Sequence, residues 1–181
     1  METVAPGPLE SIRALLNTWS IPNDTRRPVD DLPGLFTDRL AWAARMPDLR
    51  YPRHAADRRE IEHLRGELRA SLSHGDAAAI DELVSAQLWR LTVDTDTDTF
   101  AVRWFVDPAS AAGDGLAIVV DAVVARTWGR LRACPDCHWV FYDTSRNGQR
   151  TWCSMTAADG ARGCGSIAKA RAYRQRQPRA T

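Results

Sequence analysis

Four cysteines in the last third of the chain constrain its fold more than any other feature. Cys134 and Cys137 form a Cys-x-x-Cys motif, and Cys153 and Cys164 follow after fifteen and then ten intervening residues. Four thiolates can surround Zn²⁺ tetrahedrally with Zn–S bonds of about 2.3 Å. Because clustered cysteines in a reducing compartment are more often metal ligands than disulfides, this spacing predicts one structural zinc ion.

The length of 181 residues is sufficient for a domain of moderate size and a small additional module. A secretory signal begins with a basic segment that is followed by an apolar one, and the first residues lack this pattern. The longest apolar run, around residues 116–125, is too short to cross a bilayer. We therefore expect a cytoplasmic protein with no membrane partner.

Charge is distributed unevenly along the chain. Residues 126–181 carry 11 Lys and Arg against three Asp, a net charge of +8. Residues 1–125 carry 13 basic and 20 acidic residues, a net charge of −7. Four thiolates around one Zn²⁺ would lower the C-terminal value by about two. An acidic body with a basic C-terminal module favours binding of a polyanion through that module.

Helical periodicity dominates the first ninety residues. The predicted helices cover about residues 9–19, then 32–46 with Leu40 facing inward, then 55–72, and a fourth after Gly75. Four tryptophans fall on predicted apolar faces and are expected in the core: Trp19, Trp42, Trp89 and Trp104.

The period then changes to that of strands. Residues 91–93 and 100–106 are rich in β-branched and aromatic side chains, which predicts a β-hairpin. A further helix is expected from Asp107-Pro108 onward, with a break near Gly113 and Gly115.

These patterns predict an α+β fold in two parts. Residues 1–127 would form a mainly helical domain with one β-hairpin, and residues 128–181 a small, treble-clef-like zinc finger with four cysteine ligands. In the finger we expect a strand over residues 138–142 and a basic helix over about residues 166–177. Ile167, Ala170 and Tyr173 are expected to cover the core of the finger.

Basic residues of the finger are the candidates for nucleic-acid contact. Arginine pairs bidentately with phosphate or guanine, and lysine binds phosphate as a point charge. The predicted contact residues are Arg146, Arg150, Lys169, Arg171 and Arg174.

The segment RLRACPDCHWVFYDTSRNGQRTWCSM, residues 130–155, resembles the CGNR-type zinc finger. The shared pattern is Cys-x-x-Cys, then Phe-x-Asp-x-Ser-Arg-Asn, then Arg-x-Trp-Cys-Ser-Met. The preceding domain is similar to the ABATE-type helical domain that accompanies this finger, through Leu16-Asn17-Thr18, Arg27-Pro28-Val29-Asp30 and Leu40-Ala41-Trp42. The resemblance implies a zinc-binding transcription regulator, linked in some members to stress, that binds DNA through the finger.

The chain departs from this family at the motif that names it. Ten residues separate Cys153 from Cys164, where typical members have far fewer, and the next triplet is Gly165-Ser166-Ile167 instead of Gly-Asn-Arg. We expect the longer loop, centred on Asp159-Gly160, to bulge outward at little entropic cost, so that Cys164 still binds zinc.

Other functions fit parts of the sequence. The finger could be a protein–protein interaction module with a structural zinc, or a thiol redox sensor that loses zinc on oxidation. The N-terminal domain could respond to a small-molecule or protein effector, or form a homodimer. No Ser/His/Asp arrangement and no glycine-rich phosphate loop is present in the sequence, so we expect no enzymatic activity.

Overall fold

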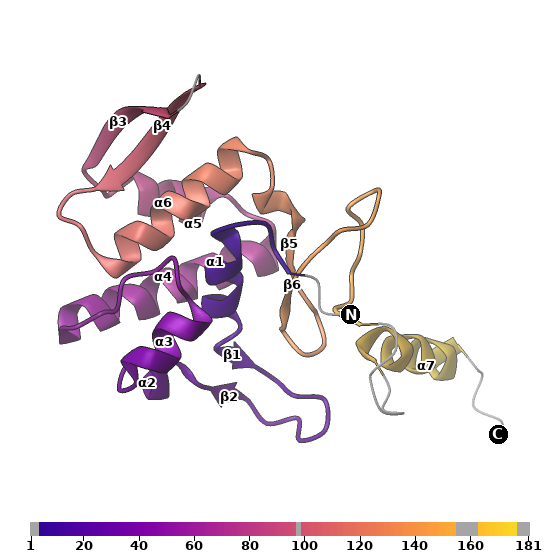
Figure 1. The fold of residues 1–181 in the computed structure, drawn as a ribbon. Coiled ribbons are helices and arrows are strands. Elements are labelled where there is room, and N and C mark those ends of the chain that lie inside the picture. The colour runs from indigo at the N-terminus through magenta and orange to yellow at the C-terminus, as the bar shows by residue number, and fades with distance from the viewer. Residues whose placement is uncertain (1–3, 97–98, 155–162, 177–181) are drawn as a thin grey trace, which may run out of the picture.

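A computed structural model describes residues 4–96, 99–154 and 163–176. The helices are α1 (Leu9–Leu16), α2 (Leu32–Leu35), α3 (Arg39–Arg45), α4 (Ala55–His74), α5 (Ala78–Ser85), α6 (Ala111–Val124), the short 3₁₀ helix η1 (Trp128–Arg130) and α7 (Cys164–Arg176). The strands form three antiparallel hairpins: β1 (Trp19–Ser20) with β2 (Val29–Asp30), β3 (Trp89–Asp96) with β4 (Thr99–Val106), and β5 (Leu131–Ala133) with β6 (Val140–Tyr142). The predicted α+β class is confirmed, and Figure 1 shows the β3–β4 hairpin and α7 projecting from the helical body.

The core of the helical body forms where α1, α4 and α6 pack against one another. Ile12 on α1, Leu68 on α4 and Val119 on α6 are fully buried. Ile12 and Leu68 lie on the apolar faces expected from the sequence, since residues three or four apart share one helix face. The outer face of α4 carries charged residues, and across the described ranges no helix has the length and apolar character needed to cross a membrane.

α6 is one continuous helix, so the break predicted near its glycines is wrong. Ser110 caps its N-terminus by accepting a hydrogen bond from the N–H of Gly113 at 3.0 Å, so the helix also starts later than predicted. A Cβ atom on Gly115 would lie 2.8 Å from Cδ2 of Leu64 on α4. Close helix packing therefore accounts for this glycine.

The helix predicted over residues 32–46 is in fact two helices. Asp38 ends the first segment and caps α3, its carboxylate accepting hydrogen bonds from the N–H groups of Leu40 and Ala41. This new start turns Leu40 outward, where it is 83% exposed, contrary to the prediction. Trp42 is buried as predicted, and its indole N–H donates to the carbonyl of Leu49 at 2.9 Å.

The predicted β3–β4 hairpin is present with a regular antiparallel register. Leu91 pairs with Trp104 and Val93 with Val102, so these side chains share one face of the ribbon. Most of this apolar face is exposed, as for Val93 at 66%. Trp104 and Trp89 are half-buried and not fully enclosed, as is Trp19.

The segment between β1 and β2, residues 21–28, is dense in turn-forming and charged residues, which is typical of a loop. In the structure it is the connection of a short hairpin, since Trp19 pairs with Asp30 and Ser20 with Val29. We call residues 21–28 the β1–β2 loop. It reaches the C-terminal cysteines, as described next.

Candidate metal centre

The four cysteines come together in one cluster. One sulfur from each of Cys134, Cys137, Cys153 and Cys164 lies within 4.8 Å of all the others. The Sγ–Sγ distance is 3.4 Å between Cys137 and Cys153, and 3.7 Å between Cys153 and Cys164. Sulfurs at the corners of a tetrahedron with 2.3 Å bonds to zinc would be about 3.8 Å apart. The separations therefore fit a tetrahedral zinc ion and exceed the roughly 2.05 Å of a disulfide bond.

Three elements supply these ligands. Cys134 and Cys137 lie in the turn between β5 and β6, where the N–H of His138 donates to the carbonyl of Cys134 at 2.8 Å. Cys153 follows the polar loop after β6, and Cys164 is the first residue of α7. A metal bound here would fix the start of α7 against the β5–β6 turn. The loop centred on Asp159-Gly160 lies outside the described residues.

The four thiols of the cluster shift one another's pKa values. A hydrogen bond from the thiol of Cys137, and to a smaller extent one from Cys153, lowers the pKa of Cys134. The same contact raises the pKa of Cys137 to about 12, and the pKa of Cys153 is raised by its hydrogen bonds to Cys134 and Cys137. Burial raises the pKa of Cys164. A zinc ion at this position would offset the negative charge of the four thiolates that bind it.

The β1–β2 loop contributes a second layer of contacts around the cluster. The Asn23 side-chain amide donates to Sγ of Cys164 at 3.1 Å, and the N–H of Ile21 donates to the carbonyl of Cys137 at 2.9 Å. Arg26 forms an ion pair with Asp136, which lies between the first two ligands. Hydrogen bonds of this kind orient ligands and hold their charge. No pattern in the sequence indicated these contacts, because each joins residues more than a hundred positions apart.

Arg69 of α4 links the helical body to the same turn. Its guanidinium donates to the carbonyls of Leu16, Trp19 and His138, and lies over the Trp19 ring at 4.6 Å. Burial lowers the pKa of Arg69 to about 10, so the group stays charged at neutral pH. The backbone of the metal-binding turn is therefore held by the helical body as well as by its own ligands.

Asp143 organises the loop that leads to the third ligand. Its fully buried carboxylate accepts hydrogen bonds from the N–H groups of Ser145 and Arg150, both at 2.8 Å. Burial alone would raise the pKa of Asp143, but a hydrogen bond from the Ser145 side chain, those from the two N–H groups and the charge of Arg132 together lower it. The carboxylate is thus a structural group of the finger.

Arg150 then positions Cys153 itself. Its guanidinium donates to the carbonyls of Trp152 and Cys153 and lies over the Phe141 ring at 5.0 Å. The side chain predicted to contact nucleic acid is therefore engaged within the finger.

The other four predicted contact residues differ in their surroundings. Arg146, Lys169 and Arg174 are exposed. Arg171 is also exposed but pairs with Asp136 at 3.1 Å. Tyr173 is 62% exposed, so the prediction that it covers the core of the finger is wrong. α7 contributes two exposed basic side chains, Lys169 and Arg174, and Arg171 is paired with Asp136 of the metal-binding turn.

Replacing Arg150 with alanine is expected to weaken zinc binding by about 10- to 100-fold, as loss of groups that orient metal ligands typically does. The change removes the hydrogen bonds to the carbonyls of Trp152 and Cys153. Competition with a coloured chelator measures the affinity. Arg146→Ala, an exposed arginine of the same loop, is the matched control and should bind zinc like the unaltered chain. Equal affinities of the two variants would show that Arg150 does not position Cys153.

Of three comparisons with known proteins, one gave a match, and it covers the residues of the metal centre. The search of curated proteins and the search of solved structures found no match. The similarity of residues 1–127 to an ABATE-type domain is not supported by a family match and stays a prediction. Residues 130–177 match the family model of the CGNR zinc finger. The C-terminal part of this chain is therefore a CGNR zinc finger, and its four-cysteine cluster is a binding site for a single structural zinc ion.

Proposed function

We propose that this protein binds double-stranded DNA through its zinc finger and acts as a transcription regulator. The observation that carries the proposal is the exposed basic surface of α7, whose first residue is a zinc ligand. Lys169 and Arg174 are each exposed on α7, and residues 163–176 contain no acidic side chain. Arg146 adds an exposed positive charge from the loop after β6.

The shape of α7 supports insertion into a groove. Its 13 residues correspond to a helix about 20 Å long, and the major groove of B-DNA, about 12 Å wide, admits one α-helix. Figure 1 shows α7 set apart from the helical body, and the side chains of Lys169 and Arg174 are exposed. Zinc fixes the start of the helix, which lowers the entropy lost when the helix docks.

Two alternatives remain weaker. A thiol redox sensor needs an accessible thiolate, whereas Cys134, Cys137 and Cys164 are buried and Cys153 is half-buried. A protein-binding module would use the same basic surface for an acidic partner, and the DNA measurement below distinguishes the two.

The remaining parts of the proposal concern the rest of the protein. One finger contacts few base pairs, so sequence-selective binding requires a homodimer or another DNA-binding partner. The N-terminal domain would respond to an effector, and the whole protein would act by binding, without enzymatic activity. We place it in the cytoplasm, where thiols stay reduced and available to zinc.

Replacing Lys169 and Arg174 together with alanine is expected to weaken binding to a DNA duplex. Each lost phosphate contact should reduce the slope of log affinity against log salt concentration by about 0.9, so the double variant should lose about 1.8. Fluorescence anisotropy of a labelled duplex, titrated with the zinc-loaded protein at several salt concentrations, measures this slope. Arg39→Ala/Arg59→Ala, which removes two exposed arginines of the helical body, is the matched control.

An unchanged slope in the Lys169→Ala/Arg174→Ala variant would remove α7 from the DNA contact surface. Absence of any duplex binding by the unaltered protein would contradict the proposal and favour an acidic protein partner. Selection from a pool of random duplexes then separates a regulator from a non-specific binder, because only the regulator enriches a shared sequence.

A further inference from the structure

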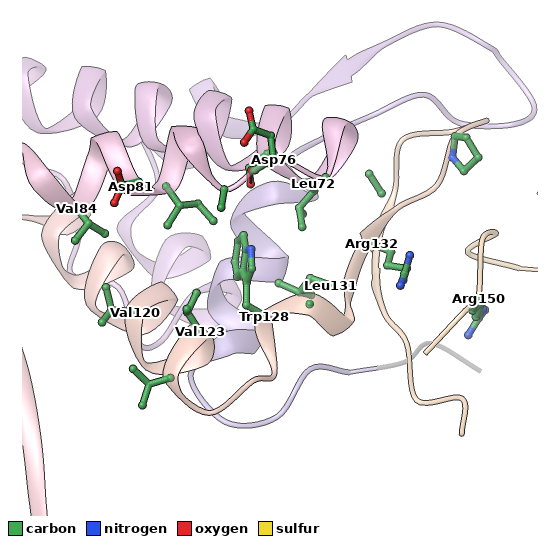
Figure 2. A pocket seen from close by; sticks show the side chains of 18 of the residues that line it. Leu72, Asp76, Asp81, Val84, Val120, Val123, Trp128, Leu131, Arg132 and Arg150 are labelled. Carbon is green, nitrogen blue, oxygen red and sulfur yellow. Dashed lines mark hydrogen bonds between the residues drawn. The ribbon is translucent and has the colours of Figure 1, made fainter. Parts of the chain in front are cut away.

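A cavity of about 830 Å³ lies between the helical body and the zinc finger. Its walls come from the end of α4, from α5, from the second half of α6 and from the segment that runs from η1 into β5 (Figure 2). Apolar side chains form most of the lining, among them Leu72, Ile80, Val84, Val120, Val123 and Trp128. Sites for small organic ligands commonly have volumes of about 300–1,000 Å³ and such apolar walls.

The finger end of the cavity is positively charged. Arg132 and Arg150 both line it, and Figure 2 shows them on the finger side, away from the valines of α5 and α6. Arg132 donates to the carbonyl of Gly148 at 2.7 Å, and Arg150 donates to backbone carbonyls of the finger. Carbonyl groups do not neutralise a guanidinium. The carboxylate paired with Arg132 is that of the buried Asp143, at 4.0 Å, so the two arginines leave an excess positive charge here.

The acidic lining residues lie at another part of the wall. Asp76 and Asp81 belong to the α5 side in Figure 2. The Asp76 carboxylate accepts a hydrogen bond from the N–H of Ala78 at 2.9 Å, and so serves the start of α5. Charge complementarity therefore places the anionic group of a ligand at the finger end and its apolar part between α5, α6 and Trp128.

We propose that this cavity binds a small amphipathic carboxylate, with its apolar chain or ring against Val84, Val123 and Trp128 and its carboxylate at Arg132 and Arg150. This rests on the effector role proposed above and gives that role a site and a ligand class. Because Arg150 also holds the carbonyls of Trp152 and Cys153, the ligand would contact the group that positions the third zinc ligand.

The test is an isothermal titration of the zinc-loaded full chain with decanoate. The heat of binding gives the stoichiometry and the dissociation constant. We expect saturable binding of one decanoate per chain with a dissociation constant below about 1 mM. Decanol and decyltrimethylammonium have the same chain without the anion, and should bind at least about tenfold more weakly because they lose the charged hydrogen bonds. Saturable binding of decanol as tight as that of decanoate, or no saturable binding of decanoate, would overturn the proposal.

Two variants locate the site. Val123→Asp places a charge on the apolar wall, and Arg132→Gln removes a cation, so each should weaken decanoate binding at least about tenfold. Val102→Asp is the matched control, since Val102 on β4 is 48% exposed, as is Val123, and does not line the cavity. Circular dichroism and zinc content establish that the variants are folded. Unchanged affinity in Val123→Asp would overturn the assigned site.

These measurements contain no DNA. A protein that binds decanoate at this site but no duplex would contradict the DNA proposal alone. A protein that binds the duplex but no decanoate would contradict the ligand proposal alone.

Discussion

Removal of zinc is expected to unfold α7 and the segment around Cys153 while the helical body stays folded. The buried residues of the finger's own core are Cys134, Cys137, Cys164 and Phe141, so three of the four are metal ligands. Trp139 and Trp152 pack against this cluster but are only partly buried, so without metal Phe141 is its one fully apolar buried side chain in the described part of the finger. Structural zinc contributes about 10–16 kcal/mol to folding in comparable small modules, far more than such a core can replace.

The β5–β6 hairpin should respond differently from α7. Leu131 of β5 and Val140 of β6 belong to the hydrophobic core of the helical body and not to the cysteine cluster. Contacts with that core persist when zinc is lost. We therefore expect the β5–β6 hairpin to keep its structure when zinc is lost, while α7 unfolds.

Hydrogen–deuterium exchange before and after chelation measures the protection of each segment separately. Amides of α7 should exchange at nearly the rate of an unfolded chain after zinc removal, while those of α1, α4 and β6 keep most of their protection. A Cys134→Ser/Cys137→Ser variant should show the same pattern without chelator. Protection of α7 that survives both treatments would show that the helix is held by contacts other than zinc.

The zinc site was predictable from two features of the sequence, namely the spacing of the cysteines and the chemistry of their thiolates. Four cysteines at suitable spacing restrict the chain to few geometries, and the ligand type selects the metal. The helix predicted over about residues 166–177 placed Cys164 just before its start, whereas α7 begins at Cys164 itself. The role of Arg150 did not follow from the sequence, since a basic side chain in a finger fits a phosphate contact as well as it fits backbone carbonyls.

Local signals also explain part of what was missed in the helical body. Asp38 before Arg39-Leu40-Ala41 has the character of an N-cap, and greater weight on capping would have divided the helix predicted over residues 32–46. In α6, the glycines reduce helix propensity, but burial against Leu64 outweighs that cost. Propensity alone cannot show which of these effects is larger.

The contacts of the β1–β2 loop with the finger had no such signal. Asn23 and Arg26 stand in a polar segment whose composition predicts a loop and nothing more. Their partners, Cys164 and Asp136, are brought near by the packing of the whole chain. Periodicity reports which face of an element is buried, and it carries no information on which distant segment covers a polar group.

Replacing Asn17 with alanine is expected to destabilise the protein by about 2–4 kcal/mol, because the Asn17 side chain hydrogen-bonds the buried backbone N–H and carbonyl of Val140 on β6. Asn17 follows α1 and is 4% exposed. Its amide donates to the carbonyl of Val140 at 2.8 Å, and its side-chain oxygen accepts from the N–H of Val140 at 2.7 Å. Alanine leaves that N–H buried without this acceptor, and the carbonyl keeps only a longer contact with Arg13 at 3.4 Å.

Chemical denaturation of the zinc-loaded protein measures this loss, and hydrogen exchange locates it. The Val140 amide should lose protection before the amides at the centre of α4, since opening of β6 no longer breaks the Asn17 contact. Asn147→Ala is the control, because Asn147 is exposed in the loop after β6 and its loss should change stability by less than about 0.5 kcal/mol. Equal stability of the two variants would show that the paired hydrogen bonds of Asn17 do not join the helical body to the finger. A selective loss at Asn17 would instead make this side chain the polar link through which α1 and the zinc-binding hairpin fold as one unit.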